Sequence, residues 1–436
     1  MTSVTRRRLL GVPLALSTLS LAACGGGDDD DSSGGGTANV RLLNVMVDVP
    51  SADVAVDTTA WFSGVAVDTV SDYDDKPTDT VTLLLRAAGS TTTLLGSSQG
   101  FGGGLSYTLI AWGRSTAPQM WKLEENSNTS EITDGKGRVR VFGATQDVGL
   151  LDVYLTGATA DLASSTPVFT GTGEGAGTGY AAVTAGTYRL RVTTSGNPDD
   201  VRLDVASVTV VATKYATLVL TAGVGGTLVN AYLLEQQGAL TALRNTNARV
   251  RVAAGVANQT TVGVTWGGST VYSTALVSPV VSPYVLVPAG TNALALSING
   301  AGASSQNATL AAGGDYTVLV TGTAAASQMA VLSEDNRIPS TLARTRIRLV
   351  HGAASQGPLT LTVDDAVIAS DVAPGTSSAV ATVVSNSSAR VEVTTVTSSD
   401  PLFLRTDANL QVRGVYTVFA LDGPTAGATG LLRKDR

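Results

Sequence analysis

The chain has 436 residues, a formal net charge of −7 and only 14% charged residues. The acidic balance argues against nucleic-acid binding, because that function requires a basic surface to neutralise phosphates. A single cysteine excludes disulfide bonds within the chain, so each domain must be held together by its own apolar core. Low charge with many small and β-branched residues favours exported β-structure over helix.

The first 23 residues have the pattern of an export signal. A basic region at residues 6–8 precedes an apolar run at residues 9–21, which is shorter than the roughly 20 apolar residues that a permanent membrane-spanning helix needs. The run ends in Leu21–Cys24, which resembles the lipobox of bacterial lipoproteins, where the cysteine becomes the lipidated first residue. We therefore predict a signal peptide at 1–23 and a membrane anchor through lipid on Cys24.

The residues around this signal bear on the export route and the destination. Thr5–Leu10 resembles a twin-arginine export motif, although an ordinary basic region also contains arginines, so both routes stay open. Gly25 stands where many inner-membrane lipoproteins have Asp, and by that resemblance the outer membrane is favoured, with its periplasmic or surface face undecided. Residues 24–37 contain GGGDDDDSSGGG, which has no apolar residue to bury and predicts a flexible tether rather than a calcium site.

A short phrase that alternates apolar and basic residues recurs four times along the rest of the chain. This alternation is typical of a half-buried strand, and its recurrence at intervals of about a hundred residues predicts four successive domains of β-sandwich size. We name them repeat 1 (38–134), repeat 2 (135–243), repeat 3 (244–340) and repeat 4 (341–436). Nothing in the phrase itself suggests a site. Its copies are Val40–Leu43, Arg138–Val141, Arg249–Val252 and Arg346–Leu349.

Each repeat continues in a common order of short strands bounded by Gly, Pro, Asn, Asp and Ser. This order, without a helical period, predicts an all-β fold of four tandem immunoglobulin-like antiparallel sandwiches. The short polar joints predict a semi-extended string of repeats. Second strands are expected at Ala52–Val56, Leu151–Leu155, Thr261–Thr265 and Leu359–Val363, and strands after a Gly turn at Ala185–Arg191 and Ala289–Leu294. Strands led by tyrosine are expected at Tyr107–Ala111, Tyr215–Val219, Tyr316–Val320 and Tyr416–Ala420, and closing strands at Trp121–Leu123, Ala231–Leu234, Met329–Leu332 and Gly430–Leu432.

This organisation resembles the DUF4397 family of bacterial extracytoplasmic domains, which occur in tandem on lipoproteins and surface proteins. The best matches are Arg346–Ala353, like the family's opening strand and turn, and Leu151–Leu155, like its second strand. The other repeats have Asn44, Gly143 and Ala254 near the place of His351. The resemblance implies a fold and an envelope location, and it brings no agreed activity.

Two motifs bear on catalysis. Gly96–Gly100 reads GSSQG and matches the nucleophile elbow G-x-S-x-G, which needs a helix after Ser98 and a partner histidine. The following Phe101–Gly104 cannot begin a stable helix, and the only histidine, His351, is three repeats away. We therefore interpret the motif as a hairpin loop, and expect His351 to end a strand and bond to the adjacent turn.

Other segments bear on ligands. Asp72, Asp74, Asp75 and Asp79 are candidate calcium ligands, but the glycine and glutamate of an EF-hand loop are missing, and a solvated loop is the alternative. The glycine-rich Gly171–Gly179 lacks the helix of a dinucleotide site and is interpreted as a long flexible loop. The repeated tyrosines are expected in the cores with their hydroxyls on loop backbone, and Trp61, Trp112 and Trp266 are expected in the cores as well.

The sequence thus predicts a non-catalytic, lipid-anchored protein of the bacterial envelope that acts as a binding module or structural spacer. It predicts no cofactor and no nucleic-acid partner, and a partner that is an envelope protein or glycan. The first alternative is a carbohydrate- or calcium-dependent adhesion module that uses the aspartates of repeat 1. The second is a serine hydrolase that uses Ser98.

Overall fold

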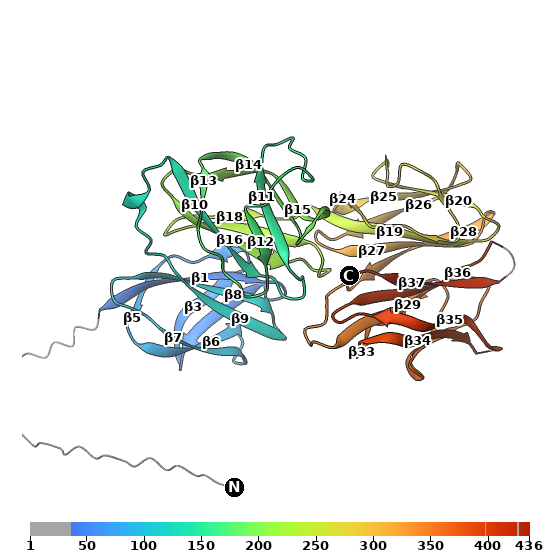
Figure 1. The fold of residues 1–436 in the computed structure, drawn as a ribbon. Coiled ribbons are helices and arrows are strands. Elements are labelled where there is room, and N and C mark those ends of the chain that lie inside the picture. Colours follow the sequence, from blue (N-terminus) through green and yellow to red (C-terminus); the bar gives the residue numbers. More distant parts are fainter. Residues whose placement is uncertain (1–35, 397, 425–426) are drawn as a thin grey trace, which may run out of the picture. The chain divides into compact units, whose positions relative to one another are not determined.

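The computed structural model describes residues 36–396, 398–424 and 427–436 (Figure 1). These residues form β-strands joined by turns, with one short 3-10 helix, η1 (Thr129–Glu131), and no α-helix among them, which confirms the all-β prediction. No helix in the described ranges is long and apolar enough to cross a membrane. The predicted signal peptide, Cys24 and most of the predicted tether lie outside the described residues. Strand β1 begins at Thr37, which is the last residue of the predicted tether.

Each predicted repeat contains one sheet built on its opening strand and a second sheet built on its second strand. In repeat 1 the orders are β4 (Thr69–Val70), β1 (Thr37–Met46), β8 (Ser106–Arg114), β9 (Ala117–Glu124), with β5 (Asp74–Pro77) also on β1, and β3 (Thr59–Ala66), β2 (Ser51–Val56), β6 (Thr80–Ala87), β7 (Thr93–Gly100). In repeat 2 they are β13 (Ala181–Thr184), β10 (Lys136–Ala144), β16 (Tyr215–Ala222), β17 (Val229–Glu235), β18 (Leu240–Leu243), and β12 (Phe169–Thr172), β11 (Leu151–Thr156), β14 (Gly186–Thr194), β15 (Asn197–Val210).

Repeats 3 and 4 follow the same plan. In repeat 3 the orders are β23 (Val280–Val281), β19 (Asn247–Val256), β27 (Asp315–Thr323), β28 (Ala326–Glu334), with β24 (Val285–Pro288) also on β19, and β21 (Ser269–Thr270), β20 (Thr261–Trp266), β25 (Gly290–Ile298), β26 (Ala301–Leu310), with β22 (Leu276–Val277) also on β20. In repeat 4 they are β32 (Thr376–Ser377), β29 (Arg344–Gly352), β36 (Val415–Asp422), β37 (Ala428–Lys434), with β33 (Ala381–Val384) also on β29, and β31 (Ala366–Val372), β30 (Leu359–Val363), β34 (Asn386–Thr395), β35 (Ser398–Leu410).

The opening strand of every repeat pairs in parallel with the strand led by tyrosine, as the neighbouring ribbons of β1 and β8 show in Figure 1. The sheets built on the opening strands are therefore mixed, which corrects the prediction of purely antiparallel sheets. The cause is topological, because the chain crosses over to the second sheet before it returns beside its own opening strand. The same pairing repeats at β10 with β16, β19 with β27 and β29 with β36.

Four apolar cores lie between the paired sheets, one in each repeat. Alternation places every second side chain of the opening strand inward: Val40 and Leu42 are fully buried in repeat 1, as are Ile347 and Leu349 in repeat 4. Residues 36–436 nevertheless form one compact unit. The division into four domains at the stated boundaries therefore stays a prediction.

The outer faces of the opening sheets are also covered in part, which corrects the predicted half-buried strand and shows that repeats of the predicted string pack against each other. Leu43 and Ile110 of repeat 1 pack in one apolar cluster with Phe142 and Val219 of repeat 2. A second cluster joins repeat 3 to repeat 4 in the same way. Basic residues of the opening strands, such as Arg41, Arg251 and Arg348, are therefore buried against a neighbouring repeat.

Candidate functional site

One arginine of each opening strand donates a hydrogen bond from Nε to a threonine hydroxyl on the parallel strand beside it. Parallel pairing places the two residues directly opposite each other in all four repeats. The sequence alternation alone did not reveal this contact, because the threonine lies about 70 residues further along the chain. The pairs are Arg41–Thr108, Arg140–Thr217, Arg251–Thr317 and Arg348–Thr417, with N–O distances of 2.8, 3.0, 2.8 and 2.9 Å.

Repeats 3 and 4 join these units into a buried cluster of four charges. Glu334 accepts Arg251 at 2.7 Å and also pairs with Arg348 of the next repeat at 2.9 Å. Asp435 in turn pairs with Arg348 at 3.5 Å and with Arg251. All four side chains are at most 4% exposed, so each charge is compensated by the partner repeat. Because no group is left free to act on a ligand, we interpret this cluster as structural.

Repeat 2 departs from this pattern. Gln236 stands where the other repeats have a carboxylate, and its side-chain amide accepts from the amide of Ser127 and donates to its carbonyl. Among the described residues Arg140 therefore has no acidic partner, and its guanidinium carbon lies 5.5 and 4.7 Å from the ring centroids of Trp121 and Tyr180. Aromatic faces attract the guanidinium and replace part of the missing ion pair.

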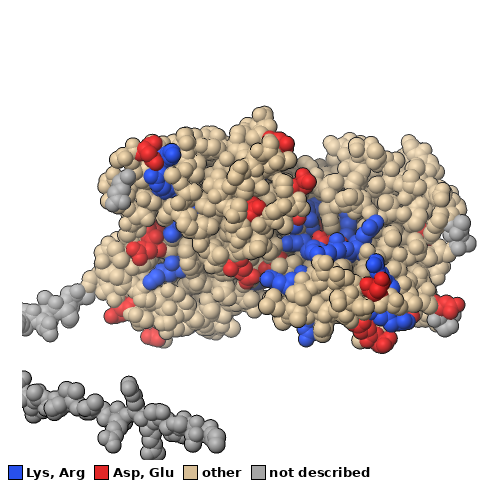
Figure 2. Space-filling model, in the orientation of Figure 1, with Lys and Arg blue, Asp and Glu red and all other residues tan. Residues whose placement is uncertain are grey.

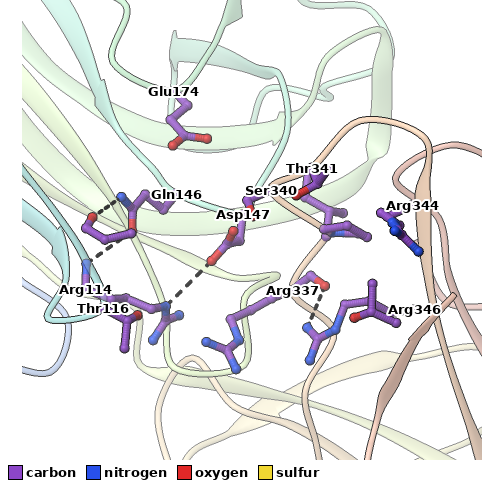
Figure 3. Close-up of a pocket in the computed structure, with 14 residues that line it drawn as sticks. Arg114, Thr116, Gln146, Asp147, Glu174, Arg337, Ser340, Thr341, Arg344 and Arg346 are labelled. Atoms are coloured by element: carbon purple, nitrogen blue, oxygen red, sulfur yellow. Dashed lines mark hydrogen bonds and ion pairs between the residues drawn. The ribbon is translucent and has the colours of Figure 1, made fainter. Parts of the chain in front are cut away.

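An open pocket with a volume of about 470 Å³ lies where repeats 1, 2 and 4 meet the segment 337–341. Figure 3 shows Glu174 on the opposite side of this pocket from Arg337 and Arg346. Four arginines face two carboxylates in its lining, a basic balance in an acidic chain. We call it the arginine pocket. Its lining residues are Arg114, Thr116, Ala117, Gln146, Asp147, Glu174, Arg337, Ile338, Pro339, Ser340, Thr341, Arg344, Arg346 and Thr382.

The four arginines of the pocket are engaged to different degrees. Asp335, just outside the lining, accepts bidentate hydrogen bonds of 2.6 to 3.0 Å from both Arg337 and Arg346. Burial opposes its ionisation, yet hydrogen bonds from Arg337 and then Arg346 hold the pKa of Asp335 well below its usual range. Arg344 is exposed and, among the described residues, forms no ion pair. It is the cation of the pocket best placed to receive a ligand.

Arg114 completes the basic wall. Its Nε lies 3.7 Å from Asp147, too far for a hydrogen bond, and is buried without a hydrogen-bond partner in the described chain (Figure 3). Burial and then repulsion from Arg337 lower the pKa of Arg114. An anion bound in the pocket would offset both the burial of Arg114 and its repulsion from Arg337, because it would place a negative charge beside these two guanidinium groups.

Glu174 reaches the pocket from the glycine-rich segment, which is pinned to β10 instead of forming the long flexible loop predicted for Gly171–Gly179. The amide of Gly143 donates to Ala176 at 2.9 Å and its carbonyl accepts from Gly175 at 2.7 Å. A Cβ at Gly143 would lie 2.0 Å from the carbonyl oxygen of Gly173, so only glycine allows this approach. Burial, and then Asp147, raise the pKa of Glu174.

The four aspartates weighed as calcium ligands do not converge in the structure. Asp72, Asp74, Asp75 and Asp79 are all exposed, and Asp74 pairs with Lys76 on β5. No group of three acidic, histidine or cysteine side chains suited to a metal ion occurs in the described part of the chain. The four aspartates therefore stay a solvated loop and short edge strand.

The hydrolase motif is placed in a strand. Ser98 lies within β7, opposite Thr82 of β6, so neither the predicted hairpin loop nor the strand-to-helix turn of a nucleophile elbow is present there. His351 is fully buried at the end of β29, as predicted. Its Nε2 lies 2.9 Å from the carbonyl of Gly357, and its Nδ1 accepts from the amide of Ala353 at 3.3 Å.

The aromatic predictions hold except in repeat 2. Tyr107, Tyr316 and Tyr416 are buried, and each hydroxyl accepts a loop amide at 2.8 to 3.1 Å. Tyr215 stands one register position earlier, opposite Arg138, so it lies on the other face and packs edge-on against Tyr180. The tryptophans named from the sequence, Trp61, Trp112 and Trp266, are buried.

The structure thus defines an all-β chain of paired sheets with a basic pocket where its repeats meet. The family model for a domain of unknown function, DUF4397, matches residues 38–154 and 248–362, and the chain belongs to this family. Each match runs from the opening strand of one repeat into the second strand of the next. The resemblance inferred from the sequence is thereby confirmed. No curated protein sequence matches the chain.

Three solved structures share a weak likeness with the chain. A candidate cell adhesion protein from Bacteroides uniformis is 12% identical over 47% of this chain and 98% of its own, with a TM-score of 0.19. The Bacillus anthracis TIE protein is 10% identical over 84% and 65%, with a TM-score of 0.14. The glucan-utilisation protein SGBP-B of Bacteroides ovatus, in complex with a mixed-linkage heptasaccharide, is 11% identical over 78% and 86%, with a TM-score of 0.11. At these scores the likeness does not bear on function.

Proposed function

We propose that this chain is a non-catalytic binding protein of the bacterial envelope, anchored through lipid on Cys24, whose arginine pocket takes an anionic group of an envelope protein or glycan. The observation that carries the proposal is Arg344, an exposed arginine with no ion pair to any described residue, in a pocket that also contains Arg114, Arg337 and Arg346. Guanidinium groups bind carboxylates and phosphates through parallel hydrogen bonds, which suits this role.

A citrate titration tests the pocket. Isothermal calorimetry on the soluble Cys24→Ser chain is expected to show citrate binding, and Arg344→Gln is expected to weaken it about fivefold, since one charge-assisted contact contributes about 1 kcal/mol. Arg405→Gln is the matched control, because Arg405 is an exposed arginine on β35 that pairs with Asp407 away from the pocket. Absence of citrate heat, or equal affinity in Arg344→Gln and wild type, would contradict the proposal.

The anchor has a separate test. Metabolic labelling with a radioactive fatty acid is expected to mark the wild-type chain in the membrane fraction, and to leave Cys24→Ser unlabelled and released. Labelling of both chains would overturn the assignment of Cys24.

A structural spacer is the second candidate, and the buried contacts between consecutive repeats favour it. Such contacts would fix the distance between the anchor and the far end of the chain. The calcium-dependent alternative has no comparable support, because its four aspartates do not converge. A spacer without a binding role would show no citrate affinity in the titration above.

A further inference from the structure

We infer that the partner of the arginine pocket is an extended protein segment in which an acidic side chain is flanked by aliphatic residues. The inference rests on the proposed function. It considers the exposed apolar side chains and the sheet edge beside the pocket together with the positive charge inside it. Eleven large apolar side chains are exposed in the described chain. Three of them, Leu150, Leu342 and Val384, lie next to lining residues or to their chain neighbours.

Two of these side chains lie beside Arg344. Val384 is the register partner of Arg344 across β33 and β29, and the carbonyl of Ala343 accepts from Ser385. Leu342 precedes Arg344 by two residues and, at 70%, has the largest exposed fraction of any described large apolar side chain, while Val384 is 59% exposed. An aliphatic border thus adjoins the free cation.

The third side chain lies across the pocket. Leu150 is 58% exposed and adjoins Gly173, where a Cβ would come within 3.1 Å of Leu150 Cδ2. Gly173 directly precedes Glu174 of the lining, so apolar surface flanks the charged pocket on this border too. The matching ligand carries its anion between two apolar groups. A small inorganic anion would leave both borders in water.

The edge of the sheet favours a peptide over other ligands of this chemistry. Among the described strands β33 pairs only with β29, so its outer edge presents unpaired backbone groups, and its Thr382 lines the pocket. An extended peptide can pair with such an edge while its alternate side chains reach the surface on either side. The lining contains no aromatic residue on which a sugar ring would stack.

A labelled peptide tests the inference. Fluorescence anisotropy with the heptapeptide Gly-Val-Leu-Glu-Val-Leu-Gly, blocked at both ends, is expected to give tighter binding to the Cys24→Ser chain than citrate gives in calorimetry. Replacing the peptide's Glu by Gln, or its aliphatic residues by Ser, is expected to weaken binding at least fivefold. Burying two aliphatic side chains in part contributes about 1 kcal/mol or more, which corresponds to that factor.

Variants separate this inference from the proposed function. The double variant Leu342→Ser, Val384→Ser changes only exposed side chains and is expected to weaken the peptide about fivefold while leaving citrate affinity unchanged. Arg344→Gln is expected to weaken both ligands. Citrate binding without peptide binding, or tighter binding of an oligogalacturonate than of the peptide, would overturn the inference alone. Absence of citrate binding would instead contradict the proposed function on which the inference rests.

Discussion

At the scale of single residues, Arg251 and Arg140 occupy the same place in two repeats but have different partners. Arg251 is buried against Glu334 and Asp435, whereas Arg140 has aromatic faces and Thr217. We expect Arg251→Met to lower the free energy of unfolding by about 3–5 kcal/mol, because it leaves two buried carboxylates to a single arginine. Arg140→Met is the matched control and should lower it by about 1 kcal/mol. Urea denaturation followed by circular dichroism measures both, and equal losses would contradict the structural role of the cluster.

His351 gives the chain one titration that can be followed without interference, since it is the only histidine. Burial lowers its pKa below the ordinary 6.5, while the hydrogen bond with Gly357 and the negative charge of Asp422 oppose that shift in part. Near pH 6.5 the imidazole of the unfolded chain therefore binds a proton more readily than that of the folded chain. The free energy of unfolding should thus decrease as the pH drops from about 7.5 through 6.5.

Proton NMR of the single imidazole should give a folded-state pKa below 6.5. Urea midpoints for wild type should decrease between pH 7.5 and 5.5, and His351→Gln should lose most of this decrease. A folded-state pKa above 6.5 would reverse the sign and refute the prediction.

At the scale of elements, β10 depends on a glycine that lets the segment after β12 approach it. Gly143→Ala would place a Cβ 2.0 Å from the Gly173 carbonyl oxygen, and neither backbone can move without losing hydrogen bonds between them. We expect a loss of about 2–3 kcal/mol in unfolding free energy. Gly179→Ala lies in the same segment with open space around its Cβ, and should change stability by less than about 0.5 kcal/mol. A similar loss in both variants would show that the approach is not tight.

Most strands could be predicted from the sequence because period-2 alternation acts locally, as at Leu359–Val363, which is β30. The parallel pairing could not, since nothing local distinguishes the pairing of Arg41 with Thr108 from an antiparallel one. Tyr215 shows the same limit. Its segment matches the tyrosine-led pattern of the other repeats, yet a register shift of one position places its side chain on the opposite face of the sheet. The arginine pocket could not be predicted for a related reason: motifs such as GSSQG describe a local spacing, while the pocket is assembled from segments up to 268 residues apart, from Arg114 to Thr382.

Arg346 shows what the sequence did contain. It belongs to the fourth copy of the repeated phrase, which the sequence marked only as the start of a repeat. On an isolated sandwich this arginine would face water. In the structure the neighbouring Asp335 and the pocket cover it, so its role depends on the contact between repeats. Repeat 4 has two arginines on its opening strand, Arg344 and Arg346, besides Arg348, the arginine that pairs with threonine in every repeat. These additional arginines are the signal that could have drawn attention to repeat 4.

At the scale of the whole described chain, a polar junction connects repeats 2, 3 and 4. Arg249 and Asp315 of repeat 3 form a buried ion pair at 2.8 Å, and Thr227 of repeat 2 donates to the same carboxylate at 2.6 Å. Arg436 donates to the carbonyls of Gly226 and Val148 from the end of repeat 4. Figure 2 shows Lys and Arg gathered in the middle of the face in view, where Figure 1 places the C-terminus. Burial and then the nearby Arg202 and Arg249 lower the pKa of Arg436 to about 9.

The same junction positions Arg337 of the arginine pocket, so a substitution at a residue outside the lining should change ligand affinity by moving Arg337. Gly226 has a φ of +79°, and a Cβ on it would lie 2.8 Å from Arg337 Cα. Because Gly226→Ala is strained in conformation and displaces the backbone that carries Arg337, we expect citrate affinity to fall at least threefold with the strand content unchanged. Gly427→Ala provides the control, since Gly427 also has a positive φ but open space around its Cβ. Calorimetry and circular dichroism on both variants measure the effect, and unchanged citrate affinity in Gly226→Ala would mean that the pocket forms independently of the junction.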